Sequence, residues 1–275
     1  MIEMMKYWVR DVGIDGYRCD VAELVPTDFW ERARTELDKI KPVIMLSEGT
    51  LPEHHAVAFD LTYSWNLYDV LPKVIDGTTK ATILNDMYAT EGYQFPKGAL
   101  RMRFNTNHDK NAWDAPAVER YSPQGAKATA VLTFTYPGVP LMYNGEEVGN
   151  AKRLDLFEKV EIDWNKSSEF RTFYIELTAL RASHVSLRRG EYLPVRNTSD
   201  AKVLSFLRRH DGDEALVVIN LSRKEQSCVV EIPSLRSAVL GEYFTKRPAS
   251  VTNGELSVDL KALDYCVFLP TTKSK

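Results

Sequence analysis

The chain has 275 residues, 44% hydrophobic and 27% charged, so it is long enough to bury a large core and is neither disordered nor fibrous in composition. Its 35 Lys and Arg residues nearly cancel its 38 Asp and Glu residues, which gives a formal net charge of −3. No basic run of the kind that follows a phosphate backbone occurs, so we expect no nucleic acid partner.

The chain also lacks the sequence features of a membrane or disulfide-rich protein. Its most apolar stretch, residues 128–143, is interrupted by threonines, prolines and a glycine, so we expect no membrane span. The first residues run with helical period and without the regions of a secretory signal, which leaves the compartment unknown. Cys19, Cys228 and Cys266 are odd in number and far apart, which favours buried thiols over disulfides or a zinc site.

In the first two thirds of the chain, predicted helices alternate with predicted strands. Apolar residues recur at helical spacing over residues 2–12, with Trp8 assigned to the core, and a strand is predicted over 14–21. A second helix is predicted to begin at Asp28 as its N-cap. The remaining predictions are strands over 43–46, 57–61, 100–105 and 140–143, and helices over 67–75, 81–88, 123–135 and 168–182. This alternation predicts a parallel sheet with helical crossovers.

The pattern changes near Pro194. From there the chain contains short β-rich runs, separated by turn sequences such as Asp211-Gly212 and Asn253-Gly254. The predicted strands are residues 203–208, 215–221, 228–232, 256–260 and 265–269. We therefore predict an α/β domain over residues 1–193, followed by an antiparallel β domain over 194–275 that packs against it.

Three carboxylates stand at the ends of predicted strands: Asp20, Glu48 and Asp109. Because the carboxyl ends of parallel strands meet at one edge of the sheet, we expect these side chains to share that edge. Grouped carboxylates shift one another's pKa, and glycoside hydrolysis requires one protonated and one ionised carboxyl group. Arg18, two residues before Asp20, is suited to hold that carboxylate ionised, and His108 to hydrogen-bond sugar hydroxyls.

Each of these residues also has a structural interpretation. Asp20 or Asp109 alone is more typical of a helix cap or a surface ion pair, and only their combination with Glu48 favours a catalytic site. Glu146 and Glu147 follow another strand, and they either reach the same edge, form a solvated pair or interact with a helix dipole. Trp65 and Trp113 lie in loops where aromatic rings stack on sugars, but core packing explains them equally well.

The segments Gly16-Tyr17-Arg18-Cys19-Asp20 and Asn107-His108-Asp109, with Glu48 between them, resemble three short characteristic segments of the α-amylase superfamily, glycoside hydrolase family 13. Residues 59–63 and 137–147 resemble further parts of that family. The resemblance implies a partial TIM (β/α) barrel, containing strands four to eight, followed by an all-β antiparallel sandwich domain.

The resemblance also implies roles for individual residues. Asp20 would be the nucleophile, Glu48 the general acid and then base, and Asp109 the stabiliser of the transition state, with Arg18 and His108 binding substrate. Such a retaining glycosidase would act on α-glucosidic bonds of malto-oligosaccharides or related α-glucans, with its two reacting carboxyl groups about 5 to 5.5 Å apart. Many starch-active members have a Lys-His pair where this chain has Glu23 and Leu24, so we expect a different acceptor side.

Two alternatives remain. A complete barrel takes about 250 residues, so residues 1–193 predict an open five-stranded sheet that is covered by a second copy of the chain or by an N-terminal half outside this sequence. The chain would then be an incomplete scaffold that binds sugar weakly or needs a partner chain. The other alternative is a transglycosidase or sugar isomerase of the same superfamily.

The resemblance does not assign a cofactor to this chain. The family's third-strand segment, which contacts sugar and the usual calcium ion, has no match in the sequence. We therefore name no metal ligand and expect no cofactor.

Overall fold

The structure is a computed structural model that describes residues 1–232, 235 and 237–271. The chain forms two compact units. The first comprises residues 1–65 and 86–102, and the second comprises residues 66–85 and 103–275. The predicted boundary between residues 193 and 194 stays a prediction.

The first unit is built on parallel strands. β1 (Gly16–Cys19) pairs with β2 (Ile44–Ser47), β2 pairs with β3 (Leu61–Tyr63), and β3 pairs with the beginning of β4 (Leu100–Phe104). The helices of this unit are α1 (Ile2–Tyr7), the π-helical turn η1 (Trp8–Val12), the 3-10 helices η2 (Ala22–Leu24) and η3 (Pro52–His55), α2 (Thr27–Asp38), and most of α4 (Ile83–Gln94). The predicted parallel sheet is confirmed.

The core of this unit lies between α1, α2 and the first two strands. It includes Met5, Val9, Leu37 and Met45. The assignment of Trp8 to this core is wrong, because Met5 and Val9 provide the buried face of the first helix and Trp8 is 47% exposed.

Two further local predictions are wrong in this unit. Asp28 is not an N-cap, because α2 already begins at Thr27 after Pro26. The strand predicted over 57–61 begins only at Leu61, because Ala58 and Phe59 are buried in the core from a turn and not from the sheet.

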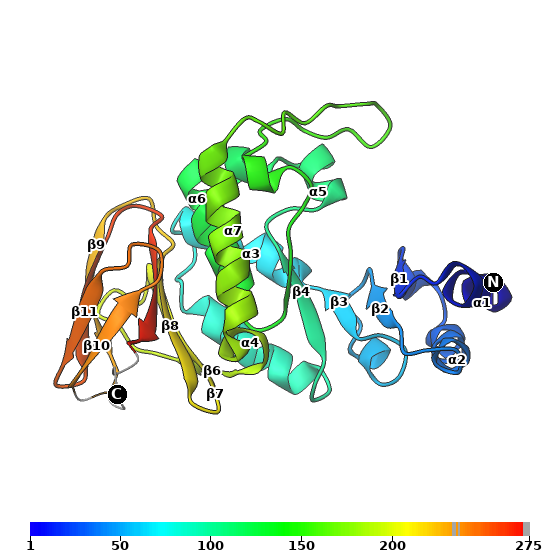
Figure 1. Cartoon of the computed structure of the whole chain (residues 1–275), viewed down its shortest axis with the longest axis horizontal. Helices are drawn as coiled ribbons and strands as arrows, with labels where there is room; N and C mark the ends of the chain where they lie inside the picture. Colours follow the sequence, from blue (N-terminus) through cyan, green and yellow to red (C-terminus); the bar gives the residue numbers. More distant parts are fainter. Residues whose placement is uncertain (233–234, 236, 272–275) are drawn as a thin grey trace. The chain divides into compact units, whose positions relative to one another are not determined.

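The second unit contains helices and an antiparallel sheet. Its helices include most of α3 (Trp65–Ile75), α5 (His108–Trp113), α6 (Ala117–Thr135), η4 (Glu146–Val148), α7 (Ser168–Ser183) and α8 (Val185–Arg189). α6 and α7 lie side by side (Figure 1). β5 (Val139–Leu141) follows α6 and comes after β4 in the strand order of the parallel sheet.

The antiparallel sheet has eight strands in the order β6-β7-β8-β13-β10-β11-β12-β9. They are β6 (Glu191–Pro194), β7 (Val203–His210), β8 (Asp213–Asn220), β9 (Gln226–Glu231), β10 (Ser237–Glu242), β11 (Pro248–Thr252), β12 (Glu255–Leu260) and β13 (Tyr265–Pro270). Strands from distant positions in this order contribute to one apolar cluster, so the sheet closes over itself as a sandwich (Figure 1). The antiparallel β domain is thus confirmed, although sequence patterns did not predict β6, β10 and β11.

Within the second unit the helices pack directly on this sheet. The buried Arg208 on β7 donates from Nη2 to the carbonyl oxygen of Gly190 at 2.9 Å and from Nη1 to that of Thr135, at the end of α6. The Tyr243 hydroxyl donates to the carbonyl oxygen of Glu176 on α7 at 3.1 Å. In the described part of the chain, no helix is both long and apolar enough to cross a bilayer.

Candidate active site

The end of β1 places a cation beside a carboxylate. Arg18 lies on the strand and Asp20 directly after it, and Arg18 Nη1 lies 2.6 Å from Asp20 Oδ1. The Asp20 side chain is 77% exposed, whereas that of Arg18 is only 29% exposed. The predicted contact between these two residues is therefore present.

Glu48, at the end of the neighbouring strand β2, contacts the same guanidinium. Arg18 Nη2 lies 2.6 Å from Glu48 Oε1, and the backbone N–H of Val21 donates to Glu48 Oε2 at 2.8 Å. Both carboxylate oxygens of Glu48 are thus held, and its side chain is 14% exposed. Because one planar guanidinium contacts Asp20 and Glu48 together, these carboxylates are close neighbours.

Arg18 itself is fixed from a third side. Its Nε donates to the hydroxyl oxygen of Tyr63, at the end of β3, at 3.3 Å. Partial burial opposes the charge of Arg18, but the hydrogen bonds to Tyr63 and Asp20 and the charge of Glu48 outweigh burial and raise its pKa. The site therefore contains a permanent positive charge between two carboxylates, which offsets their mutual repulsion.

The turn after Asp20 is strained. Val21 has φ 41° and ψ 44°, the left-handed region that β-branched residues rarely adopt. This conformation aims its N–H at Glu48, and the next N–H, of Ala22, donates to the Glu48 carbonyl oxygen at 3.2 Å. Strained backbone of this kind is concentrated at functional sites, where the surrounding structure maintains it.

His108 and Asp109, the other two predicted site residues, belong to the second unit. They open α5 directly after Asn107, which caps the helix by accepting the Lys110 N–H at 2.8 Å. His108 Nε2 lies 3.5 Å from Asp109 Oδ2, and both side chains are partly exposed. Asp109 therefore stands in the first turn of a helix, where a negative charge is favoured.

The sequence left the roles of Trp65, Trp113 and Glu146 open, and the structure places these residues in different environments. Trp65 stacks on Tyr63, with ring centroids 5.1 Å apart, and Trp113 is 65% exposed, so core packing does not explain Trp113. Glu146 is buried and is not part of a solvated pair. Desolvation raises its pKa to about 8, although it accepts hydrogen bonds from the Tyr143 N–H and the Tyr174 hydroxyl.

Sequence patterns did not single out Tyr63 as a contact of Arg18. The only signal was its position after a predicted strand, in the segment 59–63 that contributes to the resemblance. The local role of Val21 was also missed, because a left-handed conformation is not expected for valine.

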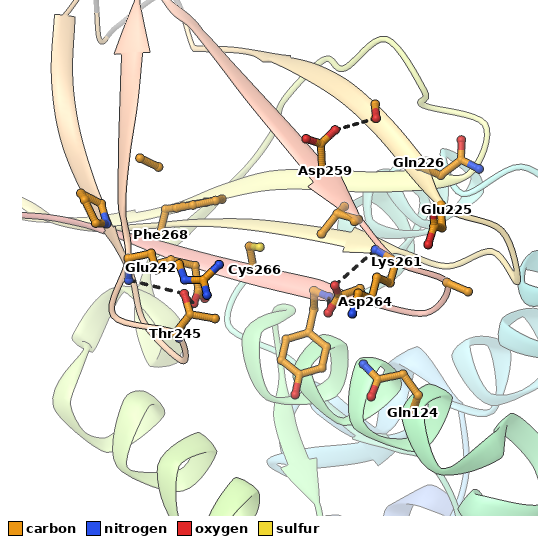
Figure 2. A pocket seen from close by; sticks show the side chains of 17 residues that line it. Gln124, Glu225, Gln226, Glu242, Thr245, Asp259, Lys261, Asp264, Cys266 and Phe268 are labelled. Carbon is orange, nitrogen blue, oxygen red and sulfur yellow. Dashed lines mark hydrogen bonds between the residues drawn. The ribbon is translucent and has the colours of Figure 1, made fainter.

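A cavity of about 920 Å³ lies in the second unit, lined by residues of the β domain and by Gln124 of α6 (Figure 2). Charged side chains line it, and two of them are engaged in local hydrogen bonds. Asp259 accepts from the Ser227 hydroxyl at 2.6 Å, and Glu242 Oε1 accepts from the Val267 N–H at 3.1 Å. Among the described residues, none of the buried unpartnered side-chain atoms belongs to this cavity, so we assign no chemistry to it.

Comparison with known proteins identifies the family. The model of the α-amylase catalytic domain matches residues 1–179. The chain belongs to the α-amylase family. A second model, the C-terminal domain of maltogenic amylase, matches residues 194–267 of this α-amylase family member.

Similar sequences include α-amylase MalA of Haloarcula japonica, which is 29% identical over 84% of this chain and 35% of its own length. A cyclomaltodextrinase from a Bacillus species is 25% identical over 80% of this chain and 41% of its own length. The chain thus spans less than half of the length of these curated relatives.

A solved maltogenic α-amylase, AmyB of Thermotoga neapolitana, superposes with a TM-score of 0.87 at 29% identity, over 98% of this chain and 65% of that one. An α-amylase of Geobacillus thermoleovorans gives a TM-score of 0.82 at 20% identity, over 99% of this chain and 63% of that one. The fold of this α-amylase family member is therefore a partial TIM barrel followed by an antiparallel β domain.

Proposed function

We propose that this chain carries the reacting carboxylates of a retaining glycoside hydrolase that acts on α-glucosidic bonds of malto-oligosaccharides or related α-glucans. The proposal rests on one observation, which is that the carboxylates of Asp20 and Glu48 both contact the guanidinium of Arg18. Relatives named α-amylase and cyclomaltodextrinase support the substrate class.

In the proposed first step, the Asp20 carboxylate attacks the anomeric carbon while Glu48 gives its proton to the departing glycosidic oxygen. The bond from carbon to the leaving oxygen breaks, and an ester bond to Asp20 forms. In the second step Glu48 removes a proton from water, the water oxygen attacks the same carbon, and the ester bond breaks to release Asp20. Both steps use only carboxyl groups and water, so the proposal needs no cofactor.

The surroundings of the two carboxylates suit these different roles. Asp20 is mostly exposed and has the Arg18 contact on one oxygen, which leaves the other oxygen open to a substrate. Glu48 is more enclosed, and one of its two contacts must be released before it can present a proton to a leaving group. We assign transition-state stabilisation to Asp109 and sugar binding to His108 as part of the same proposal.

The test is hydrolysis of maltotriose by the purified chain, compared with Asp20→Asn and with Asp28→Asn on α2 as the control. We expect Asp20→Asn to abolish hydrolysis and Asp28→Asn to leave it unchanged. Proton NMR of the first product distinguishes the stereochemistry, since a retaining enzyme releases the α-anomer first. Hydrolysis that survives Asp20→Asn would overturn the assignment.

One observation favours the second candidate, a catalytically incomplete scaffold: Asp20, the proposed nucleophile, is mostly open to solvent. Such a chain would bind sugar weakly or need a partner chain. Calorimetric titration with acarbose separates the two, because a complete pocket should bind it at micromolar concentration or below, and a scaffold only at millimolar concentration. The oligomeric state, measured by light scattering, tests whether a second copy of the chain is the partner.

A further inference from the structure

We propose that Glu23 is a positioning residue that holds Glu48 in place relative to Asp20. The inference deepens the proposed function and rests on it for the roles of Asp20 and Glu48. It comes from the loop after β1, where Glu23 follows Asp20 by three residues and reaches across to the loop after β2.

The first observation is the contact made by the Glu23 carboxylate. Glu23 Oε1 accepts hydrogen bonds from the backbone N–H of Thr50 and from the Thr50 hydroxyl, the latter at 3.0 Å. Thr50 lies two residues after Glu48, so this contact fixes the chain immediately beyond the proposed acid and base. A carboxylate that accepts two hydrogen bonds at one residue restrains that residue more strongly than a neutral acceptor does.

The second observation is the close approach at Gly49, the residue between Glu48 and Thr50. A Cβ atom at Gly49 would lie 2.5 Å from Glu23 Cγ and 3.0 Å from its Cδ. All three of the nearest atoms that such a Cβ would meet belong to Glu23. The side chain of Glu23 therefore lies directly on the backbone next to Glu48, and glycine is what permits it to do so.

The third observation is that the same short segment also holds Glu48 through its backbone. The Val21 N–H binds Glu48 Oε2, and the Ala22 N–H binds the Glu48 carbonyl oxygen. Glu23 belongs to the 3-10 helix η2 that begins at Ala22 and is capped by Val21. Movement of Glu23 would therefore move the donors that orient Glu48.

The chemistry of the position agrees with this role. The carboxylate of Glu23 can accept the Thr50 N–H, as an amide oxygen could, whereas the ammonium group of a lysine has no acceptor for it. The contact described here is therefore available to a carboxylate or an amide at this position and not to lysine.

The kinetic test compares Glu23→Ala, Glu23→Gln and, as a control, Glu53→Ala, which removes an exposed glutamate from η3. We expect Glu23→Ala to lower kcat on maltotriose about tenfold, equivalent to about 1.4 kcal/mol of transition-state stabilisation, with KM changed less than about twofold. Glu23→Gln keeps an oxygen acceptor and should restore most of kcat. Equal kcat values for Glu23→Ala and Glu53→Ala would overturn the proposal.

A double-mutant cycle tests the contact itself. Gly49→Ala should lower the melting temperature and kcat of the wild-type chain, because its Cβ displaces Glu23. In the Glu23→Ala background the same substitution should have little effect, because the atoms that it meets are gone. Additive effects of the two substitutions would contradict the close approach.

Hydrogen exchange tests the positioning without relying on hydrolysis. In Glu23→Ala we expect the Val21 amide, whose hydrogen binds Glu48, to exchange about tenfold faster than in the wild type, equivalent to about 1.4 kcal/mol of lost protection. The Glu53→Ala control should not change it. Unchanged protection at Val21 would refute the positioning role. A wild-type chain that fails to hydrolyse maltotriose would instead count against the proposed function, and the exchange result would still decide the role of Glu23.

Discussion

Arg18 Nη2 lies 2.6 Å from Glu48 Oε1, and this ion pair joins the end of β1 to the end of β2. The other terminal nitrogen of the same guanidinium contacts Asp20, so a single cation organises both proposed reacting groups. Loss of this cation would leave two carboxylates as uncompensated neighbours.

Arg18→Lys should therefore lower kcat/KM on maltotriose by about 100-fold or more, within the range for removal of a preorganised electrostatic contact. Lysine keeps a positive charge but cannot contact two carboxylates through one planar group. Arg32→Lys on the exposed face of α2 is the matched control. Steady-state kinetics of both variants check this, and a loss below about threefold in Arg18→Lys would contradict the role of the shared guanidinium.

Val21→Gly should not destabilise the chain. A valine in the left-handed conformation costs the folded state about 1 to 3 kcal/mol. A glycine loses more conformational entropy on folding, at a cost of about 0.5 to 1 kcal/mol. We expect the free energy of unfolding in urea to stay constant or to rise by up to about 2 kcal/mol. Val57→Gly, at a half-exposed valine outside the left-handed region, should lower it. A larger loss for Val21→Gly than for Val57→Gly would argue against strain.

Because of Glu146, we expect the free energy of unfolding to fall as pH rises. Its pKa is raised by burial from 4.5 to about 8, with Glu147 adding to the shift. The folded state therefore keeps a proton that the unfolded state loses above pH 4.5. The resulting stabilisation is complete below that pH and is lost as pH rises towards 8, at about 1.4 kcal/mol per pH unit between these values.

Glu146→Gln removes this titration and keeps a neutral side chain of similar shape. Urea unfolding at several pH values between 5 and 9 should show a flatter profile for Glu146→Gln and greater stability than the wild type at pH 8. Glu147→Gln, which removes a charge that adds to the shift of Glu146, should keep the fall in stability but end it at a lower pH than in the wild type. Parallel profiles for the wild type and Glu146→Gln would show that Glu146 does not titrate in this range.

Arg208→Met should destabilise the chain by about 2 to 4 kcal/mol, because it leaves one buried and one partly buried carbonyl oxygen without their donor. Those oxygens belong to Thr135 and Gly190, where helices meet β7. Arg209→Met, at the adjacent and more exposed arginine, should cost about 1 kcal/mol or less. Urea denaturation measures both, and equal losses would show that Arg208 contributes no more than a surface ion pair.

The strand ends could be predicted because apolar runs and their terminating polar residues are local features. Asp20 and Glu48 were placed correctly directly after β1 and β2, and the contact of Arg18 with Asp20 follows from their separation by two residues along the chain. The contact of Arg18 with Glu48 depends on strand pairing and is not visible in either segment alone.

Other features required tertiary information. The burial of Glu146 depends on its environment, which includes Tyr174, a residue 28 positions later on α7. The strand predicted over 57–61 begins only at Leu61, because an apolar residue can also be buried from outside a sheet, as Phe59 is. Trp8 is a third case, because burial of Met5 and Val9 leaves it on the outer side of the helix.

The hairpin of β7 and β8 has a consequence for the order of folding. His210 pairs with Asp213 across the two-residue turn Asp211-Gly212, in which both residues have positive φ. Hairpins of this kind close within microseconds, because little chain entropy is lost before the first contact forms. Parallel pairing of β1 with β2 must first close a loop that contains the whole of α2. We therefore expect the antiparallel sheet to begin forming before the two strands that bring Asp20 and Glu48 together.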